Sequence, residues 1–259
     1  MLIKRDMIFT PAGKNRPLHI WLPDGYKDSS ERYPVMYFFD GHNLFLDEDA
    51  TYGKSWGLLE FLQSWEKPII VVGIECSHEG RERLYEYCPY HYRGRFWGDL
   101  PGTGEVTMRF MAEELKPMID REYRTYASRE ATAIGGSSMG GLMSLYAAVK
   151  YNEVFSKAAC VSSSISPGMP SLREDIRRSA VDPDTRVYLS WGTEEAGGMR
   201  PDPAEDFHTA AAKNNFEIAG LIGEKGARTR VVCQRGGGHS EASWEKLVPG
   251  FMDFLWLDR

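Results

Sequence analysis

The sequence has no hydrophobic run long enough to cross a membrane, and its longest apolar stretches have the length of β-strands. The N-terminal segment, MLIKRDMIFTPAGKNRP, also lacks an apolar stretch of signal-peptide length. We therefore expect a cytoplasmic protein that does not associate with membranes.

Cysteine is scarce as well. The chain has four cysteines, which form no CxxC pair and lie far apart: Cys76, Cys88, Cys160 and Cys233. This spacing argues against a disulfide framework and against a thiolate metal centre, so we expect buried thiols in a reducing compartment. We expect neither a metal nor another cofactor.

An excess of positive charge is also missing. The formal net charge is -6 and the isoelectric point is about 5.6. A surface that binds nucleic acid needs clustered lysine and arginine, so we expect no nucleic-acid partner and no strong attraction to anionic membranes. We interpret the acidity as a contribution to solubility.

What the sequence does contain is a regular alternation of strand-like and helix-like segments. Its 259 residues, 42% of them hydrophobic, fit one domain, and we expect residues 1–259 to form a single α/β unit. Residues 35–39 and 69–74 are apolar throughout, as strands are when helices cover both faces of a sheet. Residues 18–22 alternate apolar and polar, which is typical of an outer antiparallel strand. Further strands are expected at residues 131–134, 158–161, 187–191 and 230–233.

Helical patterns separate these strands. Helices are expected at residues 108–119, 141–150, 204–214 and 241–255. Pro117 should kink or restrict the first of them. The alternation predicts the α/β class, with a mostly parallel central sheet flanked by helices on both faces. Two long irregular segments, residues 40–55 and 75–104, follow strands, where α/β proteins usually build ligand sites.

Ser138 is the first candidate catalytic residue. It lies in the GxSxG segment Gly136–Gly140, which follows an apolar strand and opens an alanine-rich helix. A nucleophile at the apex of such a sharp turn needs glycine two residues away on each side, because side chains there would clash. The following helix also directs its N-terminal amides at the position where negative charge develops. The motif alone is weak, but its strand-turn-helix setting favours Ser138 as a nucleophile.

A serine hydroxyl needs a base, and His239 is the best placed of six histidines. It lies in the segment RGGGHS, residues 235–240, after the last strand and before the last helix. We expect the glycine-rich turn to let the imidazole reach over the edge of the sheet to the serine. His42, which follows an early strand, is the rival candidate.

The third member of a catalytic triad should be an acid at a strand end between the serine and the histidine. The strand at residues 187–191 is followed by Glu194 and Glu195, and both carboxylates qualify. Two backbone amides are expected to form an oxyanion hole. Met139 follows the nucleophile and supplies one, and His42 supplies the other, because we expect Gly41 to let the backbone turn inward.

Together these segments resemble the Putative esterase family, the esterase D and antigen 85 group of α/β hydrolases. The matching stretches are DGHNLF (40–45), IVVGI (70–74), RLYEYCP (83–89), EELKP (113–117), YRT (123–125), IGGSSMGG (134–141) and GH (238–239). The resemblance implies an α/β-hydrolase fold, a nucleophile at Ser138 and a base at His239. In this family the acid commonly lies three residues after a glycine at its strand end, and counting from Gly192 selects Glu195.

The resemblance also indicates a substrate class. Relatives include carbohydrate esterases that remove acetyl or feruloyl groups, siderophore trilactone esterases, S-formylglutathione hydrolases and acyltransferases. We expect a small-molecule ester substrate, with a carbohydrate esterase as the main hypothesis and the others, or a non-catalytic binding protein, as alternatives. The loop aromatics Trp56, Tyr87 and Trp97 are expected to stack on an aryl or sugar ring. The acceptor of the acyl group and the formation of a homo-oligomer stay open.

Overall fold

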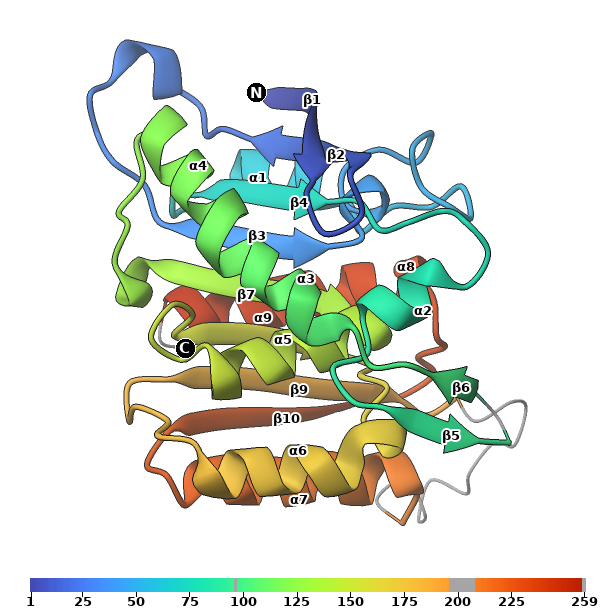
Figure 1. Cartoon of the computed structure of the whole chain (residues 1–259). Coiled ribbons are helices and arrows are strands. Elements are labelled where there is room, and N and C mark those ends of the chain that lie inside the picture. Colours follow the sequence, from blue (N-terminus) through green and yellow to red (C-terminus); the bar gives the residue numbers. More distant parts are fainter. Residues whose placement is uncertain (96, 196–207, 258–259) are drawn as a thin grey trace.

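The computed structural model describes residues 1–95, 97–195 and 208–257. Its centre is a sheet of eight strands in the order β1-β2-β4-β3-β7-β8-β9-β10 (Figure 1). Six neighbouring strands, from β4 to β10, run parallel, whereas β2 is antiparallel to both of its neighbours. The expected mostly parallel sheet is therefore confirmed. Its strands are β1 (Leu2–Phe9), β2 (Lys14–Trp21), β3 (Val35–Phe39), β4 (Ile70–Ile74), β7 (Thr132–Ser137), β8 (Lys157–Val161), β9 (Arg186–Gly192) and β10 (Arg228–Gln234).

Helices pack on both faces of this sheet. The described helices are α1 (Leu58–Ser64), α2 (Glu82–Glu86), α3 (Gly104–Phe110), α4 (Lys116–Glu122), α5 (Met139–Lys150), α6 (Met169–Arg178), α7 (Ala210–Gly223), α8 (Glu241–Trp244) and α9 (Val248–Trp256). Side chains of α3 to α7 enter one core cluster, and side chains of α1, α8 and α9 enter a second. The expected three-layer arrangement is therefore present.

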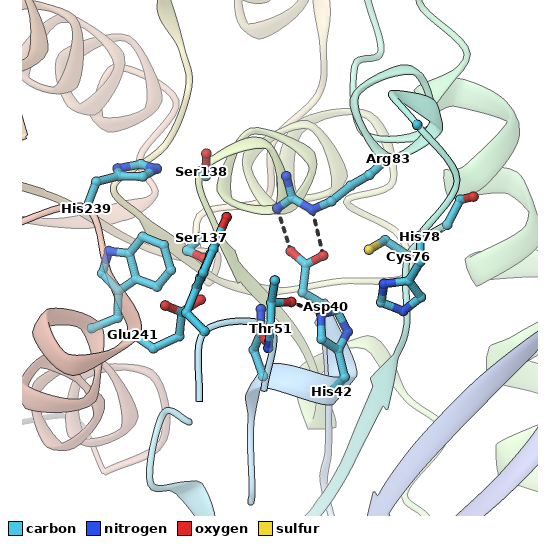
Figure 2. Close-up of a pocket in the computed structure, with 15 residues that line it drawn as sticks. Asp40, His42, Thr51, Cys76, His78, Arg83, Ser137, Ser138, His239 and Glu241 are labelled. Atoms are coloured by element: carbon cyan, nitrogen blue, oxygen red, sulfur yellow. Dashed lines mark hydrogen bonds and ion pairs between the residues drawn. The ribbon is translucent and has the colours of Figure 1, made fainter. Parts of the chain in front are cut away.

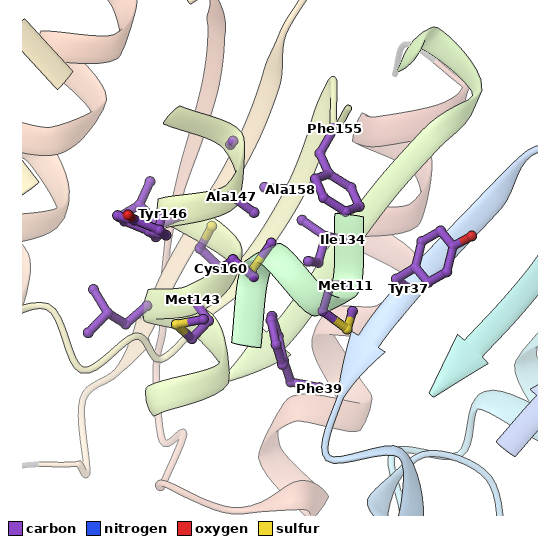
Figure 3. Close-up of a cluster of buried hydrophobic side chains, with 14 of the residues drawn as sticks. Tyr37, Phe39, Met111, Ile134, Met143, Tyr146, Ala147, Phe155, Ala158 and Cys160 are labelled. Carbon is purple, nitrogen blue, oxygen red and sulfur yellow. The ribbon is translucent and has the colours of Figure 1, made fainter. Parts of the chain in front are cut away.

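The central strand β3 separates the two clusters. Val35, Tyr37 and Phe39 point into the cluster under α5, part of which is drawn in Figure 3, while Met36 and Phe38 point into the cluster under α9. This follows from the two-residue repeat of a strand, which turns successive side chains to opposite faces. Both sides must be apolar, which explains the uninterrupted hydrophobic run.

Some elements differ from the sequence expectations. The edge strand β1 and the helix α6 were not predicted, and the segment at residues 75–104 contains α2 and a small hairpin, β5 (Tyr92–Gly94) with β6 (Gly98–Leu100). The helix expected at residues 204–214 begins at Ala210 in the described part, because the Thr209 side chain accepts the Ala212 amide and caps it there. Residues 204–207 of that expectation lie outside the described residues. His208 therefore precedes the helix instead of lying within it.

Pro117 acts on its helix as expected, but without ending it. The chain stays helical from α3 through α4, and five residues, Met111–Leu115, form a π-helical turn that Lys116 separates from the proline. Proline lacks the amide hydrogen and crowds the preceding turn, and a π-helical turn relieves that crowding. None of the helices in the described ranges is long and apolar enough to span a membrane.

The aromatic packing under α9 yields a stability prediction. Phe251 is fully buried and contacts the rings of Phe38, Trp56 and Tyr188. Replacing Phe251 with alanine should lower the free energy of unfolding by about 3–5 kcal/mol, because it removes these contacts and leaves a cavity. Urea denaturation followed by circular dichroism measures the change. Tyr126→Ala, at a side chain that is 52% exposed, is the matched control and should cost less than ~0.5 kcal/mol. Equal losses for the two variants would contradict the packing described here.

Candidate active site

Ser138 lies at the junction between β7 and α5 in an unusual backbone conformation. Its φ is 57° and its ψ is -121°, angles that a non-glycine residue rarely adopts. The turn is tight enough that a Cβ on Gly136 would lie 2.8 Å from the backbone of Gly140. A side chain at position 136 is therefore excluded, which is the steric reason for glycine before the serine.

The Ser138 hydroxyl opens into a cavity together with the imidazole of His239 (Figure 2). Ser138 Oγ lies 3.3 Å from Ser164 Oγ. Among the described residues no hydrogen bond joins Ser138 to His239, although both side chains line the same cavity. Hydrogen bonds of this kind often tighten only when substrate binds.

Glu195, not Glu194, approaches the histidine. Glu195 Oε2 lies 3.4 Å from His239 Nδ1, while Oε1 accepts hydrogen bonds from the Gly192 amide at 2.8 Å and from the Ser162 hydroxyl at 2.5 Å. Glu194 is exposed. The Glu195 carboxylate is therefore oriented by two donors and directs its other oxygen at the imidazole.

Ser162 and Trp244 support this carboxylate, and neither was predicted from the sequence to belong to the site. Ser162 adopts a φ of 46° after β8, and its hydroxyl accepts a hydrogen bond from Trp244 Nε1 at 3.0 Å while it donates to Glu195. The Trp244 ring also meets the His239 ring edge-on, with centroids 5.1 Å apart. Ser162 could have been noticed, because it follows a parallel strand at the same edge as Ser138. Trp244 fitted the apolar stripe of the helix expected at residues 241–255, and that pattern predicted only a core residue.

The glycine-rich turn before His239 is packed against the loop that carries Glu195 and is hydrogen-bonded to it. Gly236 N donates to Thr193 Oγ1 at 3.0 Å, and Glu194 N donates to Gly237 O at 2.8 Å. A Cβ on Gly192 would lie 2.2 Å from Gly237 O. The loops that carry the acid and the histidine are therefore in direct backbone contact, and this contact requires glycine.

The turn after β3 brings the His42 amide to the site. The left-handed residue there is Asp40, with a φ of 57°, and not Gly41. Gly41 is needed because its backbone contacts β4: a Cβ would lie 2.5 Å from the carbonyl carbon of Gly73. In the described part of the chain the amides of His42 and Met139 donate no hydrogen bond to a protein group. Both are therefore available to a ligand.

The buried carboxylate of Asp40 and the half-buried guanidinium of Arg83 form an ion pair at the cavity wall (Figure 2). Arg83 Nε and Nη2 each donate to a different carboxylate oxygen of Asp40 at 2.7 Å. Burial would raise the pKa of the Asp40 carboxyl group, but the charge and hydrogen bonds of Arg83 outweigh it and hold the pKa below its ordinary value. The pair therefore stays ionised near neutral pH, and the positive charge of Arg83 is largely compensated. Neither residue was singled out from the sequence, although both lie in the segments that carry the family resemblance.

The His42 side chain is not arranged as a general base for Ser138. It is buried, and its Nε2 lies 2.9 Å from Thr51 Oγ1. Burial lowers its pKa, although the carboxylates of Asp40 and Glu75 oppose this effect. A neutral ring is thus favoured, and its Nε2 is engaged away from the serine.

The three aromatic residues expected to bind substrate lie in different places. Trp56 is buried between the rings of Phe38, Trp244 and Phe251. Tyr87 is buried against Phe39, and its hydroxyl accepts the Asp40 amide. The structure therefore contradicts the expectation that Trp56 and Tyr87 stack on substrate: both are core residues behind the site. Trp97 is half-buried and borders a separate, smaller cavity with Ser163 and Ser164.

The cavity beside Ser138 has a volume of about 370 Å³, and its wall combines polar groups with apolar surface. Burial raises the pKa of Glu241 in this wall, so its carboxyl group holds a proton more readily than an exposed one. The residues that line the cavity are Asp40, His42, Asn43, Thr51, Tyr52, Cys76, Ser77, His78, Gly80, Arg83, Ser137, Ser138, His239, Glu241 and Trp244.

Similar sequences point to one family. YbbA of Bacillus subtilis is 30% identical over 185 residues, which are 70% of this chain and 69% of YbbA. The esterase Rv1288 of Mycobacterium tuberculosis is 32% identical over 167 residues, 63% of this chain and 31% of that protein. An endo-1,4-beta-xylanase/feruloyl esterase of Xylanibacter ruminicola is 25% identical over 230 residues, 86% of this chain and 28% of that protein. The chain thus spans about a third of the two larger relatives.

Solved structures share the fold. An IroE-like serine hydrolase from Shewanella oneidensis superposes with a TM-score of 0.74 at 22% identity, covering 98% of this chain and 81% of that one. The siderophore hydrolase EstA from Aspergillus nidulans superposes with a TM-score of 0.74 at 19% identity, covering 100% of this chain and 95% of that one. The family model described as Putative esterase matches residues 10–254. The chain therefore belongs to the Putative esterase family of enzymes with the α/β-hydrolase fold.

Proposed function

We propose that this esterase is a serine carboxylic-ester hydrolase that forms an acyl-enzyme on Ser138, with His239 as base and Glu195 as the orienting acid. The observation that carries the proposal is the 3.4 Å approach of Glu195 Oε2 to His239 Nδ1 at the cavity into which Ser138 opens. A carboxylate on Nδ1 keeps that nitrogen protonated and leaves Nε2 as the acceptor for the serine proton.

The reaction follows from these positions. Ser138 Oγ attacks the ester carbonyl while His239 takes its proton, and the imidazolium then protonates the leaving alcohol. Water, activated by His239, hydrolyses the acyl-enzyme and restores the serine. The Glu195 carboxylate stabilises the imidazolium that forms in each half-reaction, and the Gly192 amide and Ser162 hydroxyl hold that carboxylate in place.

The amides of Met139 and His42 are proposed to bind the oxyanion of the tetrahedral intermediate. Two properties support this assignment: Met139 opens helix α5, whose N-terminal end favours negative charge, and both amides lack a protein acceptor in the described ranges. The contact between Gly41 and Gly73 holds the His42 backbone at the edge of the sheet.

For the substrate we propose a neutral, hydroxylated molecule, such as an acetylated or feruloylated sugar. The cavity wall offers several hydrogen-bonding groups, and the positive charge of Arg83 is compensated by Asp40. An arginine whose charge is paired with a carboxylate attracts an anionic siderophore less strongly than an unpaired arginine would. The matched feruloyl esterase of Xylanibacter ruminicola agrees with this choice, whereas EstA makes a siderophore trilactone the main alternative.

We also propose that the protein works in the cytoplasm as a single domain, without a nucleic-acid or membrane partner. Cys76, Cys88 and Cys160 are buried thiols that form no disulfide, in keeping with a reducing compartment.

Replacing Ser138 with alanine should reduce kcat/KM for p-nitrophenyl acetate by roughly 10⁴–10⁶-fold, because the nucleophile is lost. Ser164→Ala is the matched control, since Ser164 carries the neighbouring hydroxyl, and it should change kcat/KM by less than ~10-fold. Full activity of Ser138→Ala, or loss of activity only in Ser164→Ala, would contradict the assignment. Circular dichroism spectra establish that both variants are folded.

The choice between the two neighbouring acids gives a second prediction. Glu195→Gln should lower kcat by about 10²–10⁴-fold, because a neutral amide cannot stabilise the imidazolium. Glu194→Gln removes an equal charge from an exposed residue and should leave kcat within roughly threefold of wild type. Steady-state kinetics of the pair decide between them, and a reversed order of the two effects would show that Glu194 is the acid.

A substrate comparison tests the proposed specificity. Acetyl and feruloyl sugar esters should give a kcat/KM at least ~10-fold above that of a catecholate trilactone or S-formylglutathione, because the cavity wall offers hydrogen-bonding groups to sugar hydroxyls and the charge of Arg83 is compensated. Product analysis in the presence of a free sugar acceptor measures hydrolysis against acyl transfer, and the acid should be the main product. A preference for the trilactone would overturn the substrate proposal while leaving the Ser138 mechanism intact.

A further inference from the structure

Three side chains at the far wall of the cavity have the chemistry of metal ligands. His42 follows β3, and Cys76 and His78 follow β4; these two strands are parallel neighbours, with Phe39 opposite Ile74. One potential ligand atom from each residue lies within 4.8 Å of those of the other two. The rings of His42 and His78 meet edge-on with centroids 4.8 Å apart, and Figure 2 shows the thiol beside them.

Both histidines are oriented by hydrogen bonds from one ring nitrogen. His42 Nε2 lies 2.9 Å from Thr51 Oγ1, and His78 Nε2 lies 2.8 Å from Glu75 Oε2. The other oxygen of Glu75 is 2.7 Å from His19 Nε2, so this carboxylate is itself held in place. A histidine that binds a metal through one nitrogen usually donates the other to a carboxylate, hydroxyl or carbonyl group, which fixes the ring.

The second nitrogen of His42 provides an independent observation. His42 is only 5% exposed, and its Nδ1 is buried without a hydrogen-bond partner in the described structure. A buried polar atom without a partner is destabilising, so such atoms usually indicate a missing ligand or water. Because Nε2 is already engaged, Nδ1 is the nitrogen that remains for a ligand.

The separations suit a small cation after a modest closure. Tetrahedral zinc with nitrogen and sulfur ligands places those ligand atoms about 3.3–3.6 Å apart. The three potential ligand atoms lie within 4.8 Å of one another, so they would have to move about 1 Å closer to bind one zinc ion. His78 has a side chain that is 57% exposed, and it has room to make that shift.

We propose that His42, Cys76 and His78 form a binding site for a divalent transition-metal cation of the zinc class. Two imidazoles and a thiolate are the donor set that such ions prefer, and hard cations such as Mg²⁺ prefer oxygen ligands. Cys76 binds as the thiolate and releases its proton to solvent. The carboxylate of Glu75, at the end of β4, adds negative charge beside the site.

This site is separate from the proposed catalytic triad of Ser138, His239 and Glu195, which requires no metal. The proposal also departs from the expectation that the four cysteines take no part in metal binding. It nevertheless shares the cavity with Ser138 and His239. A bound cation occupies space at the wall opposite the nucleophile and leaves at least one coordination position facing the cavity. We therefore expect zinc to inhibit ester hydrolysis by competing with the substrate.

Direct metal binding tests the proposal without reference to activity. The full chain is freed of metal with a chelator and titrated with Zn²⁺ by calorimetry and with Co²⁺ by absorption spectroscopy. Wild type should bind one equivalent and show a thiolate-to-cobalt charge-transfer band. Cys76→Ser should lose that band, and His78→Ala should weaken Zn²⁺ binding by at least ~10-fold. His91→Ala is the matched control, because His91 is another exposed histidine paired with a carboxylate, and it should bind like wild type.

Binding that is equal in wild type, Cys76→Ser and His78→Ala would overturn the proposal, as would the absence of binding to wild type. Thermal melts of the metal-free variants establish that they are folded. The inhibition is measured separately, as the change in KM of each variant with and without Zn²⁺. Zinc should raise KM in wild type and His91→Ala but not in His78→Ala. Because the calorimetric result does not depend on turnover, it stands even if the proposed esterase mechanism fails.

Discussion

The strained turn at Ser138 is the constraint on which the rest of the site depends. A non-glycine residue with a positive φ costs of order 1–3 kcal/mol, and the surrounding structure must supply that energy. The backbone of the serine makes three hydrogen bonds: Ser138 N donates to Val161 O at 3.0 Å, and Ser138 O accepts from Ser164 N at 2.9 Å and from Leu142 N at 3.1 Å. The close approach of Gly136 and Gly140 then joins strand to helix without a side chain between them. The parallel strands on both sides deliver the remaining groups to the same edge of the sheet.

Much of this arrangement could be predicted from the sequence, because it follows from local patterns. Apolar runs predicted the central strands to within a few residues, because a strand that helices cover on both faces must be apolar along its whole length. GxSxG between a strand and a helix identified the elbow at Ser138. The rule that ligand sites lie at the carboxyl ends of parallel strands placed His239 and an acid, Glu194 or Glu195, after the last two strands, and the family resemblance selected Glu195. The fold class and the family are confirmed, whereas the roles of the individual site residues stay predictions.

The rest depends on contacts between distant segments, which a single sequence does not display. Trp56 and Tyr87 lie in loops but pack into the core, and burial of a loop aromatic depends on what covers it. Gly41 is needed for its approach to Gly73, and not for a positive φ. The support of Glu195 by Ser162 and Trp244, and the meeting of His42 with Cys76 and His78, join residues from different strand ends and helices. Such groupings become visible only once the register of the sheet is known.

The central claim is that Ser138 is a nucleophile activated within this site. Labelling with a fluorophosphonate probe followed by peptide mass spectrometry tests it most directly, because the probe forms a covalent bond only with an activated serine and releases fluoride. The account predicts one adduct, on the peptide that contains Ser138, with no labelling of Ser138→Ala and greatly slowed labelling of Glu195→Gln. An adduct on another serine, or a wild-type protein that stays unlabelled, would contradict it.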